Sequence, residues 1–297
     1  MKYGIKRAIK YLLGTDIAGR NLAVYPDDTF IVSYPRSGNT WTRFLVGNLI
    51  SPDQPATFAN IERLVPDAEA QSSRYLKRVP RPRVIKSHQY FDHRYPRVIY
   101  IVRDPRDVAL SYYNFQRKYR QIEDGFDLTR YVSDFVGGRL SSSGWGTWGE
   151  NVGSWIAARG GQTGFLLLRY EDMIADTPRE LAKVAAFFGI AAPPQRLATA
   201  IERSSADHMR QLEKTQGGEW VSTKNKRDDI PFIGAASPGT WKAKLPESSV
   251  AEVESAWAPL MTRLGYELMN PPPGDARTAR VVRDAAPHPV AAKGPSE

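Results

Sequence analysis

The sequence lacks residues and segments that several large classes of protein require. It contains no cysteine, which excludes a disulfide framework and any zinc or iron–sulfur site held by thiolates. Its four histidines (His88, His93, His208 and His288) do not have the spacing of metal ligands, so we expect no metal. No segment approaches the roughly 20 consecutive apolar residues of a transmembrane helix, and no signal-peptide core is visible. A cytoplasmic location is therefore expected.

The charge is positive and unevenly distributed. Lysine and arginine number 41 against 32 acidic residues, and residues 1–20 carry five of the basic side chains against the single Asp16. No basic run with interleaved aromatic residues is present, so the excess favours an anionic small molecule over nucleic acid. Residues 1–13 place apolar side chains at helical spacing. A short helix packed on the domain is favoured, and the alternative is a basic amphipathic helix on the inner membrane surface.

Four β-rich apolar runs, three of them followed directly by a helical pattern, organise most of the chain. Strands that alternate with helices predict an α/β fold with a doubly wound parallel sheet flanked by helices. Asp104 and Pro105 have the residue types of an N-cap and a first helical turn. Residues 51–82 and 137–147 are predicted to be loops. The strand-containing runs cover residues 29–35, 83–88, 97–105 and 164–172.

Three segments are predicted along the chain. Residues 1–20 form the basic N-terminal segment and residues 21–270 form one domain. Residues 271–297 contain six prolines and six alanines without an amphipathic period, which is typical of a disordered tail.

The segment from residue 33 to residue 41 has the composition of a phosphate-binding loop between a strand and a helix. A glycine lets the backbone approach an anion, successive N–H groups and the helix N-terminus face it, and an arginine adds a bidentate cation. A tryptophan offers a flat face to a purine. Taken alone, the segment could equally be a tight turn before a buried helix. The candidate residues are Arg36, Ser37, Gly38, Asn39, Thr40 and Trp41.

This segment, SYPRSGNTW, resembles the loop YPKSGTTW of the sulfotransferases that use 3′-phosphoadenosine 5′-phosphosulfate (PAPS). The resemblance implies a fold like that of the P-loop NTPases and a loop that binds the 5′-phosphosulfate, with Trp41 stacked on adenine. The sequence departs from the family at Arg36, where a lysine is usual. An arginine keeps the charge but presents a planar fork instead of a point charge.

Two further motifs resemble parts of the same family. Arg103 and Ser111, in IVRDPRDVALSYYNF, keep the eight-residue interval of the family's 3′-phosphate motif. From the residues alone, Arg103 could instead form a structural salt bridge with Asp104 or Asp107. LLLRYEDM resembles the family's FxYEDM segment and implies that Tyr170 contacts adenine.

VIKSH, residues 84–88, resembles the family's KTH segment. The resemblance implies that His88 is the base that deprotonates the acceptor, which suits a side chain whose pKa lies near neutrality. Lys86 is expected to stabilise charge on the sulfuryl oxygens. A lone histidine after a strand would more often be structural, and the position at a strand end favours the catalytic role.

The sequence departs most from the family just before GTWK, residues 239–242. The family has Arg-Lys-Gly there, around the 3′-phosphate, whereas this chain has Gly234, Ala235 and Ala236. The cations expected to substitute are Lys224, Lys226, Arg227 and Lys242. The family's dimerisation motif is not matched either, so the sequence predicts no oligomeric state.

The resemblance covers about residues 29–268 and implies sulfuryl transfer from PAPS to a hydroxyl or amine, releasing adenosine 3′,5′-bisphosphate (PAP). His88, Lys86 and Arg36 are the predicted catalytic residues, without a metal. The acceptor is a small molecule, a carbohydrate or a lipid-linked glycan. The alternatives are a P-loop kinase, a non-catalytic nucleotide-binding relative and a membrane-surface scaffold. Aromatic side chains expected near the acceptor are Phe58, Tyr75, Tyr119, Phe126, Trp145 and Trp148.

Overall fold

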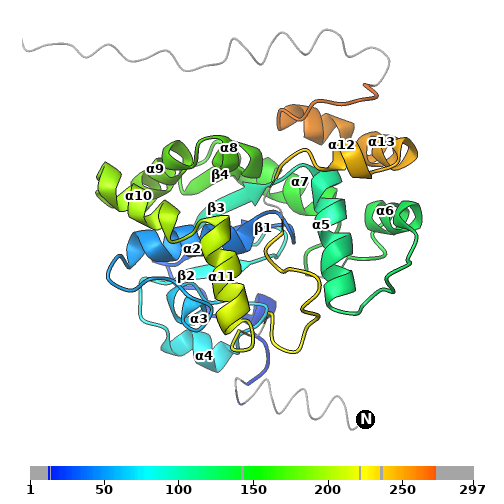
Figure 1. Cartoon of the computed structure of the whole chain (residues 1–297). Helices are drawn as coiled ribbons and strands as arrows, with labels where there is room; N and C mark the ends of the chain where they lie inside the picture. The colour runs from blue at the N-terminus through cyan, green and yellow to red at the C-terminus, as the bar shows by residue number, and fades with distance from the viewer. Residues whose placement is uncertain (1–12, 14, 142–143, 221, 235–236, 272–297) are drawn as a thin grey trace, which may run out of the picture.

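The computed structural model describes Leu13 and residues 15–141, 144–220, 222–234 and 237–271. Within these residues, four parallel strands form one sheet in the order β2-β1-β3-β4 (Figure 1). Phe30 of β1 is paired with Ile85 of β2 on one side and with Val98 of β3 on the other. The strands are β1 (Thr29–Ser33), β2 (Val84–Ser87), β3 (Arg97–Val102) and β4 (Phe165–Arg169).

Helices connect and cover these strands. They are η1 (Gly19–Asn21), α2 (Asn39–Ile50), α3 (Ile61–Leu64), α4 (Ser73–Arg78), α5 (Pro105–Lys118), α6 (Leu128–Val136), α7 (Trp148–Arg159), α8 (Tyr170–Ala175), α9 (Thr177–Phe188), α10 (Pro194–Glu202), α11 (Ala206–Gln216), α12 (Trp241–Lys244) and α13 (Glu247–Arg263).

The alternation of side chains along the central strands divides the core into two layers. Phe30 and Val32 of β1 belong to one buried cluster, and Ile31 between them belongs to the other. In β3, Tyr100 lies in the first cluster and Ile101 in the second. Strands that are buried on both faces read as continuous apolar runs, which explains the apolar runs of the sequence.

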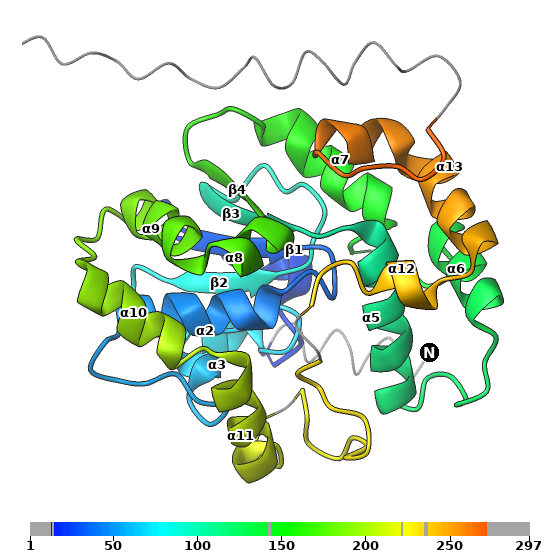
Figure 2. The same ribbon diagram turned by 45° about the horizontal axis from the view of Figure 1, so that its top comes forward.

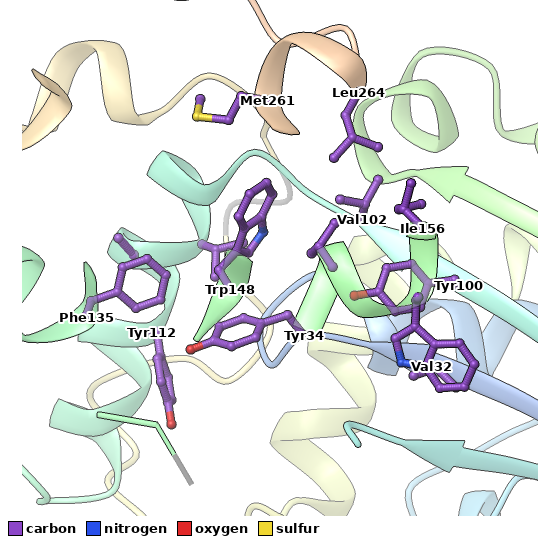
Figure 3. Close-up of a cluster of buried hydrophobic side chains, with 14 of the residues drawn as sticks. Val32, Tyr34, Tyr100, Val102, Tyr112, Phe135, Trp148, Ile156, Met261 and Leu264 are labelled. Carbon is purple, nitrogen blue, oxygen red and sulfur yellow. The ribbon is translucent and has the colours of Figure 1, made fainter. Parts of the chain in front are cut away.

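Each layer has its own set of helices. Helices α5, α6, α7, α12 and α13 cover the first cluster, and α2, α9, α10 and α11 cover the second (Figures 1 and 2). Figure 3 shows part of the first cluster, in which Tyr34, Trp148 and Met261 are buried together. The two layers hold β1 and β3 rigidly, so the residues that follow these strands have a fixed support.

The predicted α/β fold with a parallel sheet is confirmed. Asp104 is the N-cap of α5, accepting a hydrogen bond from Arg106 N, and Pro105 is in its first turn. The loop predicted over residues 51–82 is wrong in part, since α3 and α4 lie within it, and Ser72 caps α4.

The helix predicted over residues 1–13 and the tail over 271–297 fall outside the described residues, apart from Leu13 and Pro271. The domain boundaries at residues 21 and 270 stay predictions. Among the described residues, every helix is too short or too polar to cross a lipid bilayer.

Candidate active site

A cavity of about 980 Å³ lies at the carboxyl ends of β1, β2 and β3. Because β2 and β3 lie on opposite sides of β1, the chain changes direction at β1, and such a switch point is where open α/β sheets bind their ligands. Ser37 is the one predicted site residue that does not border the cavity, because it is fully buried beneath the loop. The cavity is bordered by the other ten: Arg36, Gly38, Asn39, Thr40, Trp41, Lys86, His88, Arg103, Ser111 and Tyr170.

The loop between β1 and α2 has an unusual backbone conformation. Arg36 and Gly38 have positive φ angles of 66° and 94°. A Cβ atom on Gly38 would lie 2.5 Å from Cδ2 of Tyr170, so only glycine fits without displacing that ring. The Asn39 amide donates to Ile31 O and Ser33 Oγ, which ties the loop to β1.

Polar atoms in and around this loop are left without partners. Within the described structure, Ser37 Oγ, Asn39 Oδ1 and Arg103 Nε are buried and have no hydrogen-bond partner. Buried polar atoms are nearly always satisfied. Arg103 borders the cavity, and its unsatisfied Nε–H is a donor that suits an oxygen atom of a ligand. These observations fit a phosphate-bearing ligand and argue against a simple tight turn.

Arg36 and Arg103 lie close together at this loop. Arg103 Nη1 donates to Arg36 O at 3.3 Å, and Arg36 Nε donates to Ser111 Oγ at 3.2 Å. Neither guanidinium forms an ion pair with a carboxylate among the described residues. Burial, and then the charge of Arg103, lower the pKa of Arg36 to about 10. Two cations that are close together and form no direct ion pair attract an anion.

The alternative role for Arg103, a salt bridge with its acidic neighbours, is not the arrangement in the structure. Asp104 pairs with Arg106, whereas Asp107 accepts hydrogen bonds from the N–H groups of Gly239 and Trp241. Arg103 instead lies over the ring of Tyr170, 4.5 Å from its centroid.

Trp41 and Tyr170 form an aromatic corner beside the loop. Their ring centroids are 5.9 Å apart and their planes are at 78°. The Trp41 indole N–H donates to Ser204 O at 3.0 Å, which fixes the plane of that ring. Two fixed rings bordering the cavity provide flat surfaces on which a purine can pack.

His88 follows β2 and lies at the cavity with a defined tautomer. Its Nδ1 is 2.8 Å from the carbonyl oxygen of Ser33. A carbonyl oxygen can only accept, so Nδ1 carries the proton and the neutral ring keeps its lone pair on Nε2. Burial, and then the charge of Lys86, lower the pKa of His88 to about 3. His88 is therefore a neutral imidazole near pH 7. The pKa near neutrality expected from the sequence is wrong, because burial and Lys86 disfavour the protonated ring and make it a weaker base.

Lys86 lies among carboxylates that the sequence analysis missed. Its ammonium donates to both oxygens of Asp67 at 3.0 Å and to Glu69 Oε2 at 3.1 Å. Asp67 and Glu69 border the cavity too. A backbone bridge joins Asp67 to Lys86, but both acidic residues lie in the segment predicted as a loop, where no local pattern marks them.

The cations proposed to replace the missing Arg-Lys-Gly lie elsewhere. Lys224, Lys226, Arg227 and Lys242 do not border the cavity. Arg227 pairs with Asp124 and Asp229, and Lys226 lies over the ring of Tyr119.

Four other cations border the cavity and were missed: Arg43, Lys118, Arg210 and Lys244. The first three pair with Glu62, Glu213 and Asp207 respectively, whereas Lys244 is exposed. Lys244 forms no ion pair within the described parts of the chain. The basic sequence KAK at the end of α12 was the available signal for it.

Part of the cavity wall is aromatic, and the ring centroids of Phe115 and Phe232 lie 4.9 and 5.2 Å from Arg36 Cζ. Tyr119 and Trp145, two of the six aromatic residues expected near the acceptor, border the cavity, together with Phe115, Trp220 and Phe232. Phe58 and Trp148 are instead buried in the core, and Tyr75 and Phe126 also lie away from the cavity. Within the described residues, no group of three or more acidic or histidine side chains is arranged to hold a metal ion.

The parallel sheet, the loop after β1 and the two arginines at the cavity define an α/β protein whose switch point is suited to a phosphorylated ligand. A family model described as the sulfotransferase domain matches residues 26–265. Sulfotransferase 1A1 of Mus musculus is 27% identical over 274 residues, covering 86% of this chain and 91% of that protein. The 3-beta-hydroxysteroid sulfotransferase of Cavia porcellus is 27% identical over 254 residues, covering 82% and 86%.

Solved structures share the fold. A retinol dehydratase in complex with retinol and PAP has a TM-score of 0.70 at 20% identity, with 86% of each chain covered. The mouse sulfotransferase SULT7A1 in complex with PAP has a TM-score of 0.66 at 22% identity, covering 82% of this chain and 87% of that one. The chain therefore belongs to the sulfotransferase family and is a PAPS-dependent enzyme of that family.

Proposed function

We propose that this protein transfers a sulfuryl group from PAPS to a hydroxyl or amine of a small organic acceptor, with His88 as the general base. The observation that carries this proposal is that two arginines without a direct ion pair among the described residues and a neutral imidazole border one cavity. When bound, PAPS supplies an activated sulfuryl group, and transfer forms the bond from sulfur to the acceptor while the bond to the 5′-phosphate breaks.

The donor-binding residues follow from the contacts described above. The backbone N–H groups of the loop would bind the phosphosulfate, and Arg36 would neutralise its charge. The contact of Ser37 with the phosphosulfate stays a prediction, because its side chain is buried and does not border the cavity. Arg103 and Ser111 would bind the 3′-phosphate, in the position that the family resemblance implies. Helix α12 lies beside this region (Figure 2). The carboxylate of Asp107, one turn before Ser111 on α5, accepts hydrogen bonds from the N–H groups of Gly239 and Trp241 at the start of α12. Lys244 at the end of α12 is our candidate for the missing cation.

The adenine would pack in the corner formed by Trp41 and Tyr170. A cavity near 980 Å³ is at the upper end of ligand-site volumes, so it has room for a nucleotide and a small acceptor together. The named relatives in the comparisons include a steroid sulfotransferase and a protein with bound retinol, and the aromatic residues of this cavity suit acceptors with apolar rings. A carbohydrate or lipid-linked acceptor remains the alternative to a small apolar molecule.

His88 acts by accepting the acceptor's proton at Nε2. The hydrogen bond from Nδ1 to Ser33 O keeps the ring in this tautomer and would strengthen when the ring becomes positive. The role predicted for Lys86 at the sulfuryl oxygens stays a prediction. Its ammonium would have to leave Asp67 or Glu69 to make that contact.

The test is sulfuryl transfer from PAPS to a panel of phenols and alcohols by the His88→Ala variant. Loss of a true base lowers kcat by about 10²- to 10⁴-fold. His93→Ala is the matched control, because His93 is exposed and does not border the cavity. Affinity for PAP, measured by calorimetry, should be unchanged in both variants. A His88→Ala enzyme as fast as the control would contradict the assignment of the base.

A further inference from the structure

We propose that Glu69 is a positioning residue for the base: its carboxylate holds the end of β2 in place and offsets the charge of Lys86 beside His88. This inference rests on the proposed function of His88. Neither the sequence pattern nor the family resemblance assigned a role to Glu69.

One carboxylate contacts four consecutive residues. Glu69 Oε1 accepts from Ser87 Oγ at 3.1 Å, from the His88 backbone N–H at 2.9 Å and from Gln89 Nε2 at 3.3 Å. Its other oxygen, Oε2, accepts from Lys86 Nζ at 3.1 Å. Glu69 therefore bonds to every residue from 86 to 89, alongside Asn151, which donates to His88 O, and Trp155, which donates to Gln89 O.

Glu69 is itself held in place. Its backbone N–H donates to Asp67 Oδ1 at 2.8 Å, and the same Asp67 carboxylate accepts two hydrogen bonds from Lys86. The side chains of Asp67, Glu69 and Lys86 are 10%, 16% and 8% exposed. Ion pairs and hydrogen bonds with little contact with water hold the Glu69 side chain firmly, which is the support that a general base needs.

The charges of this cluster act on His88. Proton transfer makes the imidazole positive, and Lys86 and Arg43 oppose that change, while Asp67 favours it. The carboxylate of Glu69 acts on the imidazole by offsetting the charge of Lys86, with which it pairs. Burial alone would raise the pKa of Glu69, but Lys86 and the hydrogen bond from the His88 N–H lower it below its usual value, so Glu69 is ionised. Two carboxylates and one ammonium give the cluster a charge of −1. Without Glu69, the cluster is neutral and the imidazolium is less well stabilised.

The experiment uses Glu69→Gln, which keeps an oxygen for the three hydrogen bonds to residues 87–89 and removes the charge. We expect kcat to fall by about 10- to 100-fold, the scale for a misplaced or weakened catalytic group. KM and the affinity for PAP should change little. The fall should be greater with weakly acidic alcohols than with nitrophenols, which need less help from a base. Glu69→Asp, which keeps the charge, should recover part of the lost rate.

Glu180→Gln is the matched control, because Glu180 is also a buried carboxylate paired with a lysine, Lys183, but lies on α9 away from the cavity. It should leave kcat unchanged.

The decisive comparison is the double variant with His88→Ala. If Glu69 acts through the base, Glu69→Gln should slow the His88→Ala enzyme little or not at all, since effects of residues that act as a unit are not additive. An unchanged kcat in Glu69→Gln would overturn the inference. If Glu69→Gln lowers kcat by the same factor in the His88→Ala enzyme as in the wild type, the inference is overturned as well. Glu69 would then have a purely structural role.

The two proposals fail in different ways. A wild-type enzyme without transfer activity, or a His88→Ala enzyme that keeps its rate, contradicts the proposed function. A slow His88→Ala enzyme with a normal Glu69→Gln enzyme contradicts only this inference. If Glu69→Gln does not fold, judged by cooperative unfolding and PAP binding, then Glu69→Asp is compared with wild type by the same double-variant criterion.

Discussion

The Gly38→Ala substitution tests the architecture of the loop that follows β1. At φ = 94°, an L-amino acid is strained by about 1–2 kcal/mol. The new Cβ would also lie 2.5 and 2.9 Å from two carbon atoms of the Tyr170 ring, so the ring or the loop must move. Overpacking of this kind costs about 1–3 kcal/mol. Together these effects predict a loss of about 2–5 kcal/mol in the free energy of unfolding.

The measurement is urea unfolding combined with calorimetric titration of PAP. Because the loop carries the donor site, we expect PAP affinity to fall by at least about 30-fold, the equivalent of 2 kcal/mol. Gly189→Ala is the matched control: Gly189 also has a positive φ, 69°, but a Cβ there meets nothing within 4 Å. The control should therefore show the backbone strain alone.

The clash can be separated from the backbone strain by repeating the substitution in a Tyr170→Ala background. There the ring is absent, so the cost of Gly38→Ala should fall to that of the Gly189→Ala control. Equal costs for Gly38→Ala with and without the Tyr170 ring would refute the argument that this ring requires glycine at position 38.

Two further predictions concern charge at the cavity. First, burial and Lys86 lower the pKa of His88 to about 3, so kcat/KM should show no decrease around pH 6.5 as the pH is lowered from 8 to 5. A decrease in kcat/KM with a pKa near 6.5 that the His88→Ala variant lacks would contradict the buried, neutral imidazole. Second, Lys244→Ala should reduce the preference for PAP over 5′-AMP by about 3- to 10-fold in calorimetry. Lys242→Ala, on the same helix but away from the cavity, should leave that preference unchanged. The same preference in both variants would exclude Lys244 from the 3′-phosphate site.

The fold was predictable because its determinants are local. Apolar runs such as that around Ile31 are buried on both faces, and three of the four runs precede a helix, with Asp104 as the N-cap of α5. The strand ends could therefore be located, and with them Arg36, His88 and Arg103 at one edge of the sheet.

The rest of the site depends on contacts between residues that are distant in the sequence. Glu69 meets His88 only because the chain before α4 runs back beside β2, and nothing in the local pattern of residues 51–82 encodes that. Lys244 lies at the cavity because Asp107, more than 130 positions earlier in the chain, accepts a hydrogen bond from Gly239 N and so holds the start of α12 in place. Arg227 was a reasonable candidate by position, but Asp124 and Asp229 neutralise it. Charge in a sequence does not reveal which cations already have partners.

The most direct test of the central claim is calorimetric titration of the wild-type protein with PAP and, in parallel, with 5′-AMP. The unpaired arginines at the cavity predict that PAP binds at least about tenfold more tightly, a difference of about 1.4 kcal/mol supplied by the 3′-phosphate. Arg103→Ala should remove this preference while leaving the affinity for 5′-AMP nearly unchanged. Equal affinities of the wild type for the two nucleotides would contradict the assignment of this cavity as the PAPS site.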